Sequence, residues 1–184
     1  GEALYAKGSF LEAETWYRKS LEAKPDHVPA FLALAKLLSP DRTVEAEDLY
    51  KKAFKLDGDS PDVYIHYAKH LEDHGQESIA AKLMRDAVKK FPKNFNIFAV
   101  SAELQRKIND YHLAQQYYEK AAELNPTSPS AQMNLGAMYH MLMKFDQAEK
   151  CYLKALELAP NDQSTIDNLI KLRSTMKQKE KILS

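Results

Sequence analysis

Three histidines stand four residues apart in one stretch of this chain: His66, His70 and His74. On a helix, residues at this spacing lie on successive turns, so two of the imidazoles could bind a metal ion such as zinc. No carboxylate is clearly placed to complete the ligand set, and the three positions face a groove, the interior and a turn if the stretch packs as a helical hairpin. Two alternatives follow, a structural metal site or three ordinary helix residues. We expect the second and assign no metal ligand.

Other motifs for metal or catalytic chemistry are incomplete. The loop at Asp57, Gly58 and Asp59 has the start of a calcium-binding loop, but its twelfth position is Ala68 where a bidentate glutamate is required. The sequence contains no HExxH, no phosphate-binding glycine loop, no CxxC pair and no nucleophile elbow. We therefore expect neither a catalytic residue nor a cofactor in this chain.

Composition limits the partners. The 184 residues are 45% apolar and 28% charged, with 26 basic and 26 acidic residues and a formal net charge of zero. A neutral chain offers no general attraction to a phosphate backbone. No apolar run reaches the roughly 20 residues that a membrane-spanning helix needs. We expect a folded chain whose partners do not include nucleic acid.

The elements that position these residues recur along the chain. Alanine occupies one position at intervals of 33, 34, 34 and 34 residues, and small residues occupy a second position seven residues later. Helices approach closely only where side chains are small, and larger ones there would cost roughly 1–3 kcal/mol. The two series indicate repeated packed units: Ala13, Ala46, Ala80, Ala114 and Ala148, followed by Ser20, Ala53, Ala87, Ala121 and Ala155.

Residues 129–162, PSAQMNLGAMYHMLMKFDQAEKCYLKALELAPND, contain the most complete copy of this unit. Leu135, Gly136 and Tyr139 on a first helix, with Phe145 and Ala148 on a second, resemble the pattern of a tetratricopeptide repeat. The resemblance implies an all-α fold without β-strands. We expect a right-handed superhelix of helix-turn-helix repeats, an α-solenoid, whose first helices line the concave face.

The repeat boundaries follow from this register. We predict a single domain over residues 1–184, with repeats at 1–27, 28–60, 61–94, 95–128 and 129–162 and a capping helix at 163–178. The first repeat is truncated and begins within its first helix, so we interpret the chain as a piece of a longer protein. The second is one residue short near Pro40, which cannot continue a helix. Gly58 is expected to end a helix with a positive φ.

In tetratricopeptide repeats, certain positions of each first helix tend to face the concave groove. Here they combine an apolar middle with scattered polar groups, which suits an extended peptide or a helix of another protein. For each residue the alternative is an ordinary solvated position. The candidates are Lys36, Ile65, His66, Lys69, Val100, Glu103, Met133, Asn134, His140, Asn168 and Lys171.

Of two known groove patterns, one is absent and the other is only partly present. The cations that bind a C-terminal carboxylate in co-chaperone repeats are replaced by Ile65, Ala99 and Glu103. The asparagines that recur in the repeats of sugar transferases are represented by Asn134 and Asn168. The first pattern therefore argues against a carboxylate clamp, while the second offers a short ladder of two amides.

A more specific resemblance extends over nearly the whole chain. The segment MNLGAMYHMLMKFDQAEKCYLKALELAPNDQSTIDNLIKLRSTMKQK, with its NLIKL cap, is similar to the C-terminal end of the transmembrane and TPR-repeat O-mannosyltransferases, and KGSFLEAETWYRKSLEAKPDHVPAFLALAKLL and EAEDLYKKAFKLDGDSPDVYIHYAKHLEDHG are similar to their preceding repeats. That family implies an endoplasmic-reticulum membrane enzyme that transfers mannose from a dolichol-linked donor to Ser or Thr of cadherin-type domains, with the repeats in the lumen. Its catalytic acidic residues lie in a membrane part that this sequence lacks.

These observations favour a protein-binding module, the luminal acceptor-recognition part of such a transferase. The alternative is a cytosolic scaffold or a co-chaperone-like adaptor built from the same repeats. A multi-span membrane segment upstream of Gly1 would select the first reading, and a soluble continuation would select the second.

Overall fold

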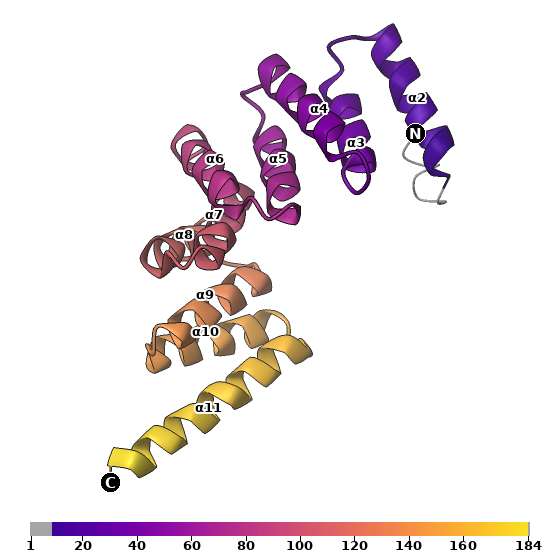
Figure 1. Ribbon diagram of the computed structural model, residues 1–184. Coiled ribbons are helices and arrows are strands. Elements are labelled where there is room, and N and C mark those ends of the chain that lie inside the picture. The colour runs from indigo at the N-terminus through magenta and orange to yellow at the C-terminus, as the bar shows by residue number, and fades with distance from the viewer. Residues whose placement is uncertain (1–8, 184) are drawn as a thin grey trace. The chain divides into compact units, whose positions relative to one another are not determined.

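In the computed structural model, residues 9–183 are described, with side chains up to Lys179. These residues form α-helices joined by short turns and no β-strand (Figure 1), so the expected all-α solenoid class is confirmed. The truncated first helix expected within residues 1–8 lies outside the described residues. The helices are α2 (Phe10–Ala23), α3 (Val28–Leu38), α4 (Thr43–Leu56), α5 (Pro61–Asp73), α6 (Glu77–Lys90), α7 (Phe95–Lys107), α8 (Tyr111–Leu124), α9 (Pro129–Met141), α10 (Phe145–Leu158) and α11 (Gln163–Leu183).

The chain divides into two compact units, one ending at Lys90 and one beginning at Phe91. In the first unit, α2 packs on α3, and the pairs α3 with α4 and α5 with α6 form helical hairpins. In the second unit, α7 with α8 and α9 with α10 form the hairpins, and α11 packs on α10. The expectation of one continuous domain stays a prediction.

Local sequence explains where the helices begin. Proline occupies the first turn of α3, α5 and α9, where its fixed φ is suitable and its missing N–H is not needed. The side chains of Asn94, Asp110 and Ser128 accept backbone N–H groups at the starts of α7, α8 and α9. Such caps satisfy donors that the first turn leaves unpaired.

The small residues of the period are buried. Ala13, Ala46, Ala80, Ala114 and Ala148 have no exposed surface. At Gly136 the approach is closer still, because an added Cβ would lie 2.8 Å from a ring carbon of Tyr152 and 3.2 Å from the Ala148 carbonyl oxygen. Close helix contact therefore accounts for the residue types that define the register.

The positive-φ expectation for Gly58 is wrong. Helix α4 ends at Leu56, and Asp57 leaves it with φ of −142° while its N–H still bonds the Ala53 carbonyl. Among the described residues, left-handed backbone occurs instead at Gly75, Asn109 and Met143, with φ of 71°, 63° and 58°. These positions lie between the two helices of a repeat, where the chain must reverse direction.

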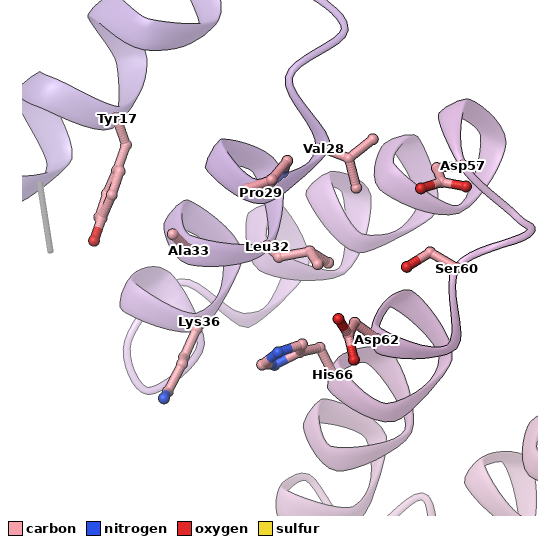
Figure 2. Close-up of a pocket in the computed structure, with 10 residues that line it drawn as sticks. All are labelled: Tyr17, Val28, Pro29, Leu32, Ala33, Lys36, Asp57, Ser60, Asp62 and His66. Atoms are coloured by element: carbon pink, nitrogen blue, oxygen red, sulfur yellow. The ribbon is translucent and has the colours of Figure 1, made fainter. Parts of the chain in front are cut away.

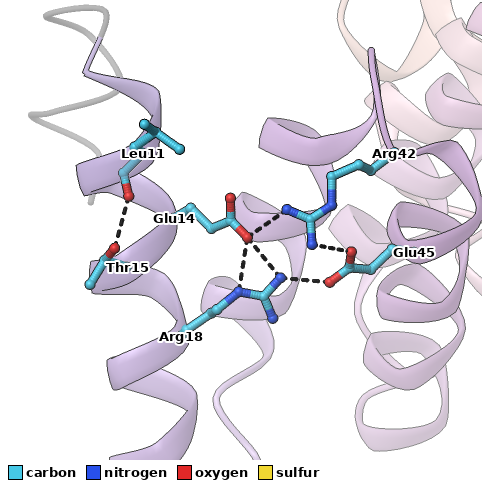
Figure 3. A network of polar contacts seen from close by, with 6 residues as sticks. All are labelled: Leu11, Glu14, Thr15, Arg18, Arg42 and Glu45. Atoms are coloured by element: carbon cyan, nitrogen blue, oxygen red, sulfur yellow. Dashed lines mark hydrogen bonds and ion pairs between the residues drawn. The ribbon is translucent and has the colours of Figure 1, made fainter.

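The short second repeat is held by an ion-pair network (Figure 3). Arg42, in the turn between α3 and α4, donates to Glu14 on α2 at 2.8 Å and also pairs with Glu45. Arg18 on α2 pairs with Glu14 at 2.8 Å and with Glu45 at 2.6 Å. Burial alone would raise the pKa of Glu14, but hydrogen bonds from both guanidinium groups lower it. The network joins α2 to α4 and to the turn that precedes α4.

The last helix is longer than predicted, since α11 continues to Leu183 rather than ending near residue 178. No proline or glycine occurs between Gln178 and Leu183 to stop it. Leu169 and Leu172 are buried against the second unit, as expected of a capping helix. The helix therefore covers the core with its first half.

Candidate functional site

The three histidines do not converge on a metal site. His70 is 3% exposed, and its Nδ1 lies 2.8 Å from the hydroxyl of Ser39. His74 places Nδ1 2.7 Å from the His70 carbonyl oxygen and Nε2 3.0 Å from the Ser39 carbonyl oxygen. Among the described residues, no three His, Cys, Asp or Glu side chains could hold a metal ion together. The second and third histidines thus fasten α5 to the short turn after α3.

The first unit contains a cavity of about 400 Å³ between α3 and α5. Figure 2 shows the His66 ring extending from α5 toward α3, with Asp62 beside it and Lys36 on the opposite helix. Burial and the charge of Lys36 lower the pKa of His66, while Asp62 opposes the shift. The side chains that line this cavity are Tyr17, Val28, Pro29, Leu32, Ala33, Lys36, Asp57, Ser60, Asp62 and His66.

The second unit contains a more polar cavity of about 420 Å³, lined from all five of its helices. It brings together five of the residues that the sequence proposed for a groove, namely Glu103, Asn134, His140, Asn168 and Lys171. The other lining residues are Arg106, Tyr118, Ala137, Met141 and Tyr152.

Two charged residues that line this second-unit cavity, Glu103 and Arg106, form an ion pair with each other. The Nε of Arg106 donates to Glu103 at 3.1 Å, and the hydroxyl of Tyr118 donates to the same carboxylate at 2.7 Å. Burial would raise the pKa of Glu103, but these hydrogen bonds lower it, so the carboxylate stays ionised. Arg106 was not among the candidate residues, although its position three residues after Glu103 on a helix is a signal for such a pair.

Other residues that line the cavity carry polar groups that are not fully paired within the protein. Within the described residues, the side chains of Asn134, His140 and Lys171 make no hydrogen bond or ion pair, and Nδ2 of Asn168 donates one weak hydrogen bond, to the sulfur of Met133 at 3.7 Å. Burial and the nearby charge of Lys171 lower the pKa of His140, which keeps its ring neutral at pH 7. The lining therefore offers amide, imidazole and ammonium groups to a ligand.

The remaining candidate residues lie elsewhere. Ile65 and Val100 are half-buried but do not line either cavity. Lys69 pairs on its own helix with Glu72 at 3.0 Å and Asp73 at 2.9 Å. Met133 packs against the core of the second unit. Their place in a binding surface stays a prediction.

This architecture of paired helices, with small residues at a fixed period, defines a class of repeat proteins. A family model described as tetratricopeptide repeat matches residues 129–162, and another of the same description matches residues 1–27 and 97–128. The chain belongs to the tetratricopeptide-repeat family.

Among proteins with such repeats, this chain is similar to protein O-mannosyl-transferases. The protein O-mannosyl-transferase TMTC2 of Homo sapiens is 38% identical over 97% of this chain, and TMTC1 of the same organism is 29% identical over 99%. The resemblance to O-mannosyltransferases inferred from the sequence is thereby confirmed. The chain spans about a fifth of the length of these relatives, 21% of each.

A solved structure supports the fold alone. The structure of PilF from Pseudomonas aeruginosa is 20% identical and has a TM-score of 0.79, covering 98% of this chain and 82% of that chain. In the part of this chain that the structure describes, no helix is both long and apolar enough to cross a membrane.

Proposed function

We propose that this chain is the acceptor-binding part of a protein O-mannosyltransferase of the endoplasmic reticulum, and that it binds cadherin-type domains on the luminal side of the membrane. Relatives named as protein O-mannosyl-transferases align with nearly all of the chain, which supports this activity for the full protein. Tetratricopeptide repeats typically bind other proteins, which supports a recognition role for this part. In this proposal, binding by the chain needs no cofactor, and mannose transfer occurs elsewhere in the full protein.

The observation that carries the proposal is the pair of available amides in the second-unit cavity. Asn134 on α9 and Asn168 on α11 are 34 residues apart and line the same cavity. A side-chain amide has both a donor and an acceptor, so it can bond the N–H and C=O of an extended polypeptide. Such bonds do not depend on the side chains of that polypeptide. Two such amides suit an acceptor that is recognised by its backbone.

Binding of a folded cadherin-type domain to the chain tests this proposal. Asn134→Ala and Asn168→Ala should each weaken binding by about tenfold, because each change removes up to two hydrogen bonds with a net value of about 0.5–1.5 kcal/mol apiece. Gln116→Ala is the matched control, since it removes an exposed amide of α8 outside the cavity. Calorimetric titration measures all three.

Two results would contradict the proposal. Undiminished binding by both asparagine variants would exclude the second-unit cavity as the binding site. Binding of short peptides from a cytosolic partner, with no binding of the cadherin-type domain, would favour the scaffold alternative.

A further inference from the structure

The charges around the second-unit cavity do not balance. Glu103 and Arg106 neutralise each other, and His140 is neutral at pH 7. Lys171 is exposed and has no carboxylate partner among the described residues. The lining therefore carries one uncompensated positive charge.

We infer that this cavity selects polypeptide segments that carry an aspartate or glutamate, whose carboxylate pairs with Lys171 while Asn134 and Asn168 hold the adjoining backbone. The inference rests on the proposed function and specifies the acceptor segment that the same site takes. It makes Lys171 the residue that determines specificity.

Helix geometry supports these separate roles for Asn168, which bonds the backbone, and Lys171, which pairs with the carboxylate. Asn168 and Lys171 are three residues apart on α11, so they lie on neighbouring turns of one face. A backbone bonded to the Asn168 amide thus brings its side chain within reach of the Lys171 ammonium. A basic side chain at that point would meet two cations, Lys171 and Arg106, with only one carboxylate, already paired, to offset them.

The positive excess of this cavity is not a property of the whole chain, whose formal net charge is zero, and the first-unit cavity does not share it. The first-unit cavity is lined by one lysine, Lys36, and by two carboxylates, Asp57 and Asp62. Its charge balance has the opposite sign because His66 is neutral at pH 7. The preference for an acidic residue is therefore expected only in the second unit.

Selection from a displayed library of random peptides tests the inference with the full chain as bait. Peptides that lose binding to the Asn134→Ala and Asn168→Ala variants define ligands of the cavity, and these should be enriched in Asp or Glu at one position. Replacing that residue by its amide should weaken binding to the wild-type chain by about fivefold, as for a partly exposed ion pair. The difference should shrink as the ionic strength is raised to about 0.5 M.

Lys171→Glu should reverse the preference and enrich Lys or Arg at the same position, and Lys171→Gln should abolish it. Lys150→Glu is the matched control, because it makes the same charge change at an exposed position of α10 outside the cavity, and it should keep the acidic preference. If cavity ligands bind equally well in acid and amide forms, the inference is wrong while the proposed polypeptide site stands. If no selected peptide depends on Asn134 or Asn168, the proposed site itself is wrong.

Discussion

At the scale of single residues, His70 combines burial with a role in the fold. Its ring packs 5.0 Å from the Tyr50 ring and 4.5 Å from the His74 ring, and it exchanges a hydrogen bond with Ser39. Burial and the neighbouring His74 lower the pKa of His70 below its ordinary value of 6.5, while Glu47 and Asp73 oppose the shift. The folded chain therefore holds this imidazole neutral where the unfolded chain would begin to protonate it.

This shift predicts that acid destabilises the fold. Below pH 6.5 the unfolded chain binds more protons than the folded chain, so the free energy of unfolding should fall as the pH is lowered from about 7.5 to about 5. His66 and His140 have pKa shifts of the same sign and add to the effect. His70→Asn, which keeps a polar atom near Nδ1 but cannot titrate, should reduce this pH dependence. Urea unfolding across the pH range measures it, and an unchanged slope in the variant would contradict the assignment to His70.

At the scale of elements, the turns within the third, fourth and fifth repeats all require one residue with left-handed backbone, and different residue types occupy that position. Gly75, Asn109 and Met143 occupy the same left-handed position at intervals of 34 residues. Glycine adopts this conformation without steric cost and asparagine tolerates it, whereas a long side chain such as methionine is strained there. The repeat geometry therefore overrides the preference of Met143.

Met143→Gly should raise the free energy of unfolding by about 0.5–1 kcal/mol, because it relieves this strain at a side chain that is 63% exposed and loses little packing. Met141→Gly is the control, since Met141 is also exposed but lies in helical backbone at the end of α9, where glycine costs about 1 kcal/mol. Urea midpoints of the two variants should shift in opposite directions. Destabilisation by both would show that the Met143 side chain contributes more than its backbone strain costs.

At the scale of the whole molecule, each unit has a hydrophobic core of its own. Buried residues from Ala13 to Val63 form one cluster, and buried residues from Ala102 to Leu172 form another. In repeat proteins, stability is approximately a sum over repeats and their nearest-neighbour contacts. A piece that keeps a complete set of neighbours should therefore remain folded.

Residues 91–184 expressed alone should give a helical circular dichroism spectrum and a single cooperative urea transition. The cap formed by α11 is essential to this result, because Leu172 is fully buried and Leu169 nearly so. Removing residues 163–184 from the fragment should abolish the cooperative transition by exposing the core beneath them. A non-cooperative wild-type fragment would mean that the second unit depends on the first.

The sequence by itself determined the period, the helical class and the positions of closest packing. Residues such as Gly136 and Ala148 are small because two backbones meet there, and that demand recurs in every repeat, so it is visible without coordinates. The family resemblance follows from the same residues, and the comparisons confirmed it.

Only the tertiary structure decided which polar side chains are paired within the protein and which remain available to a ligand. Glu103 is engaged by Arg106 and Tyr118, whereas Asn134 and Lys171 line the same cavity without partners among the described residues. Spacing along the chain cannot distinguish these cases, because pairing depends on distances between different helices. The left-handed turn at Met143 is similar, since it is imposed by how the two helices of the repeat pack and contradicts the preference of the residue itself.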